Sequence, residues 1–301
     1  MKGVILAAGK GSRLFPVTQR IPKPLLPLAN RPTMAYAFDR LIEMGITDIC
    51  VIVGDNEDVM KQALGTGSEF GVSLTFARQM EPKGLAHALG FAKTFCGQDA
   101  FCMYLGDAIY SDSLAPFCAR FKESGCANLN LVKSVEDPSR FGVANVDGER
   151  IVKLVEKPAN PESNLAMAGL YFFGPEIWTV LDDLKPSARG EFEITDAIQL
   201  LIDRDETVLA GVYEGEWFDT GTLDSFLATS SFLVQGRSRI DGEVLGEVGP
   251  GVVVGSGAVV TCRRIEDTVV LPGVQVTSEG LIIHSIIGED IVATEIADAI
   301  V

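Results

Sequence analysis

Short apolar runs alternate with segments of helical periodicity through the first third of the chain, and this alternation constrains the fold more than any other feature. Buried strands are expected at Gly3–Ala8, Asp48–Val53, Ser73–Gln79 and Ala100–Leu105. Helices are expected at Arg31–Met44, Glu57–Leu64 and Gly84–Phe95. Alternating strands and helices predict an α/β, doubly wound, Rossmann-like sheet that is mixed but mainly parallel. Ligands of such sheets bind beyond the carboxyl ends of the strands, where Gly9 and Asp107 fall.

The pattern changes near Cys126, where successive strands are separated by turns rather than by helices. Strands are expected at Asn128–Val135, Gly142–Val146, Ile151–Glu156 and Ala166–Phe173, and Glu216–Asp219 is expected to end another strand. Helices are expected at Pro175–Leu184, Glu193–Ile202 and Thr222–Val234. We interpret this stretch as a mixed region built onto the first sheet.

The composition and the repeat pattern change again after Gln235, where Gly and Val dominate and apolar residues recur every six positions. Such a repeat is typical of a parallel β-helix, whose coils stack to share one core. The sequence therefore predicts a catalytic domain over residues 1–235 and a short, left-handed, hexapeptide-repeat β-helix over residues 236–301. Because a short β-helix exposes coil ends that can pair, we expect a homo-oligomer in which this second domain contributes contacts or regulation.

Charge and cysteine content narrow the class of partner. The formal net charge is -16 and the pI is about 4.6, so the surface repels nucleic acid and anionic membranes. A phosphorylated ligand would need a local basic site or a metal ion. No apolar run reaches the length of a bilayer span, and the N-terminus is a poor signal peptide. The six cysteines show no CxxC spacing, so we expect reduced core residues in a cytoplasmic protein.

The opening loop, Gly9-Lys10-Gly11-Ser12-Arg13, follows the first expected strand. Leu14 stands where a dinucleotide fingerprint needs its third glycine, and the Gly-Lys-Ser/Thr order of an ATPase phosphate loop is absent. A plain turn would explain the glycines but not the cations Arg13 and Lys23. Glycines let backbone N–H groups approach an anion, and Arg and Lys neutralise phosphate charge. We therefore favour a phosphate loop.

This opening stretch carries a family resemblance. Leu6-Ala7-Ala8-Gly9-Lys10-Gly11-Ser12-Arg13-Leu14-Phe15-Pro16, with Pro22-Lys23-Pro24-Leu25-Leu26-Pro27, resembles the signature of the nucleoside-diphosphate-sugar pyrophosphorylases, or sugar-1-phosphate nucleotidyltransferases. The similarity extends over most of residues 1–234 and is greatest to members that transfer thymidylyl groups to glucose 1-phosphate. It implies an Mg²⁺-dependent enzyme in which the sugar phosphate attacks the α-phosphorus of dTTP in line, giving dTDP-glucose and pyrophosphate. Such chemistry depends on positioning and charge neutralisation more than on a covalent nucleophile.

The resemblance assigns roles to residues of this sequence. Asp107 and Asp219 match the metal-binding aspartates, and two carboxylates with phosphate oxygens suit Mg²⁺. Arg13 would stabilise charge on the transferring and leaving phosphates, and Lys23 would hold pyrophosphate oxygens. The catalytic set implied is Arg13, Lys23, Asp107, Lys157 and Asp219. The nucleotide-binding set implied is Leu6, Ala8, Gly9, Gly11, Ser12, Arg13, Gln79, Gly84 and Asp107.

Base and sugar segments are implied further along the chain. Gln79 and the backbone at Gly84 resemble the segment that meets a pyrimidine edge, which favours thymine or uracil but does not separate them. Glu156 would accept hydrogen bonds from sugar hydroxyls, and Lys157 would hold the sugar phosphate. The sugar-phosphate set implied is Leu85, Gly142, Glu156, Lys157, Met167 and Trp217. Two departures concern the sugar: the family often has Tyr at Phe141 and Val-Thr-Gly at Met167-Ala168-Gly169.

Three alternatives stay open at this point. One is a UTP-dependent uridylyltransferase acting on glucose 1-phosphate or an amino-sugar 1-phosphate. Another is a non-catalytic regulatory subunit that binds nucleotide-sugars, which the complete cation and carboxylate set disfavours. A dinucleotide-binding oxidoreductase is disfavoured by Leu14. His284, in the repeat region, invites an acetyltransferase-like reading, but the region is short for a second active site, so we expect a structural role.

Overall fold

The structure, a computed structural model, describes residues 1–301 and separates into two compact units. The first unit comprises Met1–Gly9 and Ala37–Trp217, and the second comprises Lys10–Tyr36 and Phe218–Val301. Residues Lys10–Tyr36, which lie between the first two expected strands, thus belong with the C-terminal part of the chain. None of the helices is both long enough and apolar enough to cross a membrane.

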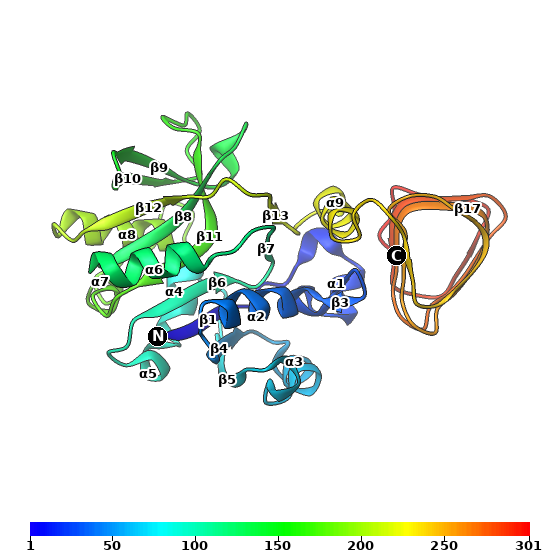
Figure 1. Cartoon of the computed structure of the whole chain (residues 1–301), viewed down its shortest axis with the longest axis horizontal. Coiled ribbons are helices and arrows are strands. Elements are labelled where there is room, and N and C mark those ends of the chain that lie inside the picture. Colours follow the sequence, from blue (N-terminus) through cyan, green and yellow to red (C-terminus); the bar gives the residue numbers. More distant parts are fainter. The chain divides into compact units, whose positions relative to one another are not determined.

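The first unit is built on a nine-stranded sheet with the order β5-β4-β1-β6-β11-β8-β12-β10-β9 (Figure 1). Its strands are β1 (Lys2–Leu6), β4 (Asp48–Val53), β5 (Ser73–Arg78), β6 (Phe101–Leu105), β8 (Asn128–Ser134), β9 (Gly142–Asp147), β10 (Arg150–Glu156), β11 (Leu165–Phe173) and β12 (Val208–Val212). The pairs among β5, β4, β1 and β6 are parallel, as expected for a doubly wound sheet. β11 runs antiparallel to β6 and β8, and β10 runs antiparallel to β9 and β12, so only half of the sheet is parallel.

Helices cover both faces of this sheet. They are α2 (Thr33–Glu43), α3 (Glu57–Leu64), α4 (Leu85–Gly90), α5 (Lys93–Cys96), α6 (Ala115–Ser124), α7 (Ile177–Leu181) and α8 (Ile194–Asp203). Alternate strand side chains point to opposite faces. Val4 and Met103 share a core with α4, α7 and α8. On the other face Phe121 of α6 stacks on Phe172 with ring centroids 5.6 Å apart.

Several sequence predictions need correction. The expected helix Gly84–Phe95 is two helices, because Gly90 is a poor helix former and the chain turns after it. The expected helix at Arg31–Met44 begins only at Thr33, since Arg31–Pro32 forms β3 and pairs with β2 (Pro27–Leu28). The expected helix Pro175–Leu184 shortens to Ile177–Leu181. β7 (Ala108–Tyr110), α6 and β12 were not predicted. The six cysteines are all buried and none forms a disulfide, in line with the expectation of reduced core residues.

The second unit begins with a long segment that carries little regular structure, Lys10–Tyr36. It contains the short helices η1 (Ser12–Leu14), α1 (Val17–Arg20) and η2 (Lys23–Leu25). The chain re-enters this unit at β13 (Trp217–Asp219) and continues into α9 (Leu223–Leu233), which starts with a capping box formed by Thr222 and Ser225.

Residues 236–301, here called the tail, form parallel strands that wind in stacked turns (Figure 1). The strands are β14 (Arg239–Ile240), β15 (Glu243–Val248), β16 (Val253–Val254), β17 (Val259–Val270), β18 (Gln275–Ser278), β19 (Leu281–Ile287), β20 (Ile291–Ala293) and β21 (Ile296–Ala297). Val253 pairs with Val269, and Thr268 pairs with Ser285. Apolar residues such as Val260, Val276 and Ile282 are buried, as their repeat predicted.

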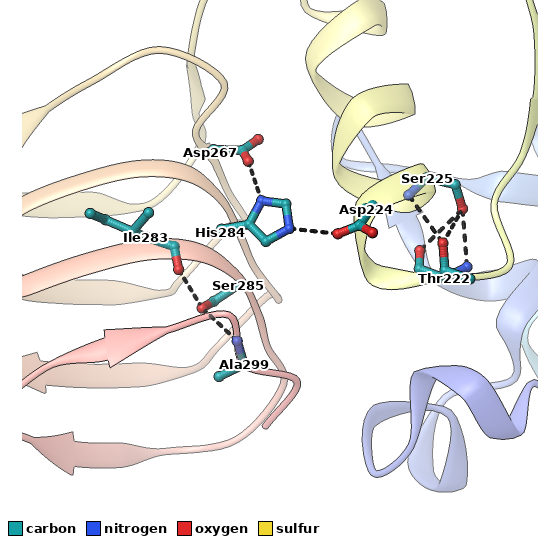
Figure 2. A network of polar contacts seen from close by, with 8 residues as sticks. All are labelled: Thr222, Asp224, Ser225, Asp267, Ile283, His284, Ser285 and Ala299. Atoms are coloured by element: carbon teal, nitrogen blue, oxygen red, sulfur yellow. Dashed lines mark hydrogen bonds and ion pairs between the residues drawn. The ribbon is translucent and has the colours of Figure 1, made fainter.

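The tail packs on α9 through β17 and β19, and a histidine joins the two (Figure 2). His284 Nδ1 lies 2.6 Å from Asp267 of β17, and its Nε2 lies 2.9 Å from Asp224 of α9. Hydrogen bonds to both carboxylates raise the pKa of His284 above its ordinary value. The histidine that invited an enzymatic reading is therefore engaged in contacts within the second unit.

Candidate functional site

The glycine-rich loop and Asp219 come together in the second unit. Gly11 has a φ of 64°, and its carbonyl accepts hydrogen bonds from the Leu14 N–H at 2.9 Å and from Thr18 Oγ1 at 2.8 Å. A Cβ on Gly11 would lie only 3.2 Å from Lys23 Cβ, so a glycine here lets the loop close over Lys23. The loop is thus a closed turn with Ser12 and Arg13 exposed at its surface.

Two cations surround the Asp219 carboxylate. Lys23 is 8% exposed, and its Nζ lies 3.8 Å from Asp219 Oδ1. A Cβ added to Gly221 would lie 2.6 Å from the Arg13 guanidinium and 2.9 Å from Asp219 Oδ1, which places Arg13 beside the same carboxylate. The structure therefore brings together three of the predicted catalytic residues, Arg13, Lys23 and Asp219, from segments two hundred positions apart.

Leu6, Ala8, Gly9 and Asp107 lie in the first unit, where its parallel strands β1 and β6 end. Leu6 ends β1, and Ala8 and Gly9 follow it. The Leu6 carbonyl accepts a hydrogen bond from Gly106 N–H at 3.0 Å, which fixes the turn that presents Asp107. Asp107 is half-buried directly after β6, as the sequence predicted. No cluster of three or more His, Cys, Asp or Glu side chains forms a metal cage.

The base segment, Gln79–Ala86, is the stretch predicted to bind the base. It follows β5, and main-chain hydrogen bonds hold it in place. Gln79 N–H donates to Val53 O at 2.8 Å, so its buried side chain starts at the strand end. The Lys83 carbonyl accepts from Phe192 N–H at 2.8 Å, and Ala86 N–H donates to Phe192 O at 3.1 Å. Gly84 has a φ of 107°, and a Cβ there would lie 2.4 Å from Phe192 O. Only glycine satisfies both conditions.

The predicted sugar segment forms a second group of side chains in the first unit. Glu156 ends β10, and Lys157 Nζ lies 3.5 Å from its Oε1. Gly142 lies against this carboxylate, because a Cβ on it would be 3.2 Å from Glu156 Oε2 and 3.1 Å from Met167. The half-buried Leu85 begins α4. Trp217 packs on Phe141 with ring centroids 5.2 Å apart, and its indole nitrogen is buried with no hydrogen-bond partner.

Sequence reasoning missed the partners that orient Glu156. Thr195 Oγ1 donates to Glu156 Oε2 at 3.2 Å, and Arg189 Nη1 lies 3.4 Å from Oε1. Arg189 also lies 3.3 Å from Glu193, whose pKa is raised by burial and then by the charge of Glu156. The sequence predicted only a helix from Glu193 at this place, and that prediction gave no partner for Glu156.

The sequence is similar to those of known proteins. Residues 2–236 match the family model described as nucleotidyl transferase. A low-salt glycan biosynthesis nucleotidyltransferase, Agl11 of Haloferax volcanii, is 36% identical over 96% of this chain and 92% of its own length. A glucose-1-phosphate thymidylyltransferase of Streptomyces antibioticus is 41% identical over 88% of this chain and 76% of its own length.

Solved structures show the same relationship. A structure described as a glucose-1-phosphate thymidylyltransferase from Bacillus anthracis, in complex with sucrose, aligns with a TM-score of 0.72 at 40% identity. The alignment covers 77% of this chain and 94% of that one. A UDP-glucose pyrophosphorylase in complex with UDP-glucose aligns with a TM-score of 0.71 at 26% identity, over 78% of this chain and 99% of its own.

Proposed function

Since the chain belongs to the nucleotidyl transferase family and is a sugar-1-phosphate nucleotidyltransferase, we propose that it transfers a thymidylyl group from dTTP to glucose 1-phosphate. The observation that carries the transfer chemistry is the grouping of Arg13 and Lys23 around Asp219. Two cations beside a carboxylate suit a triphosphate, because negative charge builds up on the leaving pyrophosphate in the transition state. The thymidylyl assignment is supported by the names of relatives near 40% identity.

In the proposed reaction, one group of residues binds the triphosphate and another binds the sugar 1-phosphate. Backbone N–H groups of Gly9, Gly11 and Ser12 would bind the triphosphate, with Arg13 and Lys23 neutralising its charge. Lys157 would hold the phosphate of the sugar, and Glu156 would accept hydrogen bonds from its hydroxyls. A phosphate oxygen of the sugar 1-phosphate then attacks the α-phosphorus, the bond to the β-phosphate oxygen breaks, and pyrophosphate leaves with that electron pair.

Asp107 and Asp219 are the proposed Mg²⁺ ligands. Their chemistry fits this ion, because Mg²⁺ in phosphate-transfer sites takes one or two carboxylates and completes its shell with phosphate oxygens and water. Lys23, beside Asp219, would attract the phosphate oxygens that complete such a shell. When bound, Mg²⁺ would neutralise phosphate charge.

Initial rates with dTTP and UTP, each crossed with glucose 1-phosphate and an amino-sugar 1-phosphate in the presence of Mg²⁺, test the proposal. The expected result is the highest kcat/KM with dTTP and glucose 1-phosphate. Equal or better turnover with UTP would overturn the thymidylyl assignment. A complete lack of pyrophosphate release with every pair would favour a non-catalytic subunit that binds nucleotide-sugars.

Uridylyl transfer is the second candidate, and the likeness to a UDP-glucose pyrophosphorylase supports it. Thymine and uracil present the same hydrogen-bonding edge, so Gln79 and Gly84 would serve both. The two candidates differ at the thymine methyl and the ribose 2′-hydroxyl, and the rate matrix separates them directly.

We also propose that the tail is a short β-helix and that it mediates a homo-oligomer, with the catalytic domain ending near Gln235. Parallel strands with buried Val and Ile, and the exposed apolar residues Leu245 and Val292, support this. Sedimentation of the full chain against a chain ending at Gln235 tests it. A truncated chain that stays oligomeric would contradict the proposal.

A further inference from the structure

The side-chain amide of Gln79 is held by two contacts inside the first unit. Its Nε2 lies 3.3 Å from the carbonyl oxygen of Gly84 and 3.0 Å from Nδ1 of His87. A carbonyl oxygen can only accept a hydrogen bond, so the contact with Gly84 fixes which end of the amide is nitrogen. The second hydrogen of Nε2 then points to His87.

This arrangement also fixes the state of His87. Its Nδ1 must accept the amide hydrogen, so the ring is neutral and carries its proton on Nε2. Phe91 meets the ring edge-on at 5.2 Å and Phe192 stacks at 6.2 Å between centroids. With both amide hydrogens engaged, Oε1 is the polar atom that Gln79 offers to a ligand.

We infer that His87 is a positioning residue that sets Gln79 as an acceptor and thereby selects bases that carry an N3–H. Thymine and uracil donate from N3, whereas cytosine presents an acceptor there, so two acceptors would face each other. The inference rests on the proposed role of Gln79 in base binding. It adds a cause for that role, and it assigns the specificity against cytosine to His87, which acts through Gln79.

The charged groups around His87 support a neutral ring. Burial, followed by the charge of Lys83, lowers the pKa of His87, while Glu81 acts in the opposite direction. The other elements against the ring contribute the uncharged side chains of Phe91 and Phe192. When acid protonates Nδ1, the ring becomes a donor and the amide of Gln79 must rotate to meet it. The amide nitrogen would then face N3–H, and binding of thymine or uracil would weaken.

The test compares His87→Phe with His87→Gln. Phenylalanine keeps the ring contacts but removes the acceptor, whereas glutamine supplies an acceptor oxygen that does not titrate. For His87→Phe we expect the KM for dTTP and UTP to rise about fivefold, as for one lost hydrogen bond, with kcat nearly unchanged. We also expect its kcat/KM preference for dTTP over dCTP to fall about tenfold. His87→Gln should keep the wild-type preference and lose the rise in KM that the wild type shows as the pH falls below the ordinary pKa of histidine.

Gln79→Ala separates this inference from the proposed function. If Gln79→Ala raises the nucleotide KM and His87→Phe leaves both KM and preference unchanged, the positioning role is wrong and base binding by Gln79 stands. If Gln79→Ala also has no effect, both ideas fail. The KM for the sugar 1-phosphate should not change in any of the three variants. Should His87→Phe not fold, a wild-type pH profile retained by His87→Gln would overturn the inference by itself.

Discussion

The base segment of the first unit and the Lys10–Tyr36 segment of the second unit are held in different ways. The base segment is pinned by main-chain hydrogen bonds to β4 and to Phe192. The Lys10–Tyr36 segment is tied to the tail by side chains instead. Asn30 Nδ2 donates to Asp241 at 2.8 Å and to Val254 O at 2.9 Å, and Arg20 pairs with Glu289.

The proposed contacts with the substrates therefore depend on two different kinds of structural support. Base and sugar contacts depend on strand ends, which are defined by the sheet itself. Triphosphate contacts depend on a segment whose position needs the tail as a partner. Changes in the tail should therefore alter the KM for the nucleotide, while changes at the sheet ends should alter base and sugar selection.

The largest effect is expected at the two aspartates, one in each unit. Asp107→Asn and Asp219→Asn should each lower kcat by about 10²–10³-fold, because each removes a negative charge proposed to bind Mg²⁺. Asp182→Asn, which breaks an exposed pair with Lys93, is the matched control and should be silent. Pyrophosphate release under saturating substrates is the measurement. A loss confined to one aspartate would assign the metal to that unit alone.

Gly84→Ala breaks the main-chain support of the base segment. A Cβ at this position meets Phe192 O at 2.4 Å, and the φ of 107° is strained for alanine. We expect the KM for the nucleotide to rise at least tenfold and unfolding free energy to fall by about 2 kcal/mol. Gly90→Ala is the control, since a Cβ there has no neighbour within 4 Å and alanine favours the end of α4. Equal effects of the two changes would contradict the close approach described here.

Asn30→Gly tests the side-chain support of the second unit. Glycine keeps the φ of 60° accessible and removes only the amide that binds Asp241 and Val254. A rise in the nucleotide KM of a few-fold is expected, as for one or two hydrogen bonds, with the sugar 1-phosphate KM unchanged. Asp205→Gly, at an exposed position with a φ of 62°, controls for the added chain entropy. A change in the KM for the sugar 1-phosphate instead would contradict the proposal that the tail supports only the triphosphate contacts.

The same contrast explains what could be predicted from the sequence. β4 and α3 were predicted to the residue, because β-branched and amphipathic patterns are local. The break after Gly90 was missed because a single glycine within a helical pattern does not by itself decide where a helix ends. The short strand Arg31–Pro32 was missed because it forms only by pairing with β2. Candidate site residues were proposed where a strand end and a charged residue coincide, as at Asp107. The contacts of Glu156 with Arg189 and Thr195 join residues distant in the sequence, so no local pattern indicated them.

The smallest effect is expected at His284, which joins the tail to α9. Its pKa is raised by Asp267 and Asp224, so the protonated ring is favoured by the folded state. That stabilisation is complete below the ordinary pKa of the unfolded histidine and is lost as the pH rises through the higher folded value. Asp224 is largely exposed, so solvent screens this contact. Raising the pH from 6 to 9 should therefore lower the melting midpoint by about 1–2 °C through this group. His284→Asn tolerates the φ of 47° and removes the titration, so its melting curves should lack that component. If the pH dependence of the variant equals that of the wild type, the contacts of His284 with Asp224 and Asp267 do not contribute to stability.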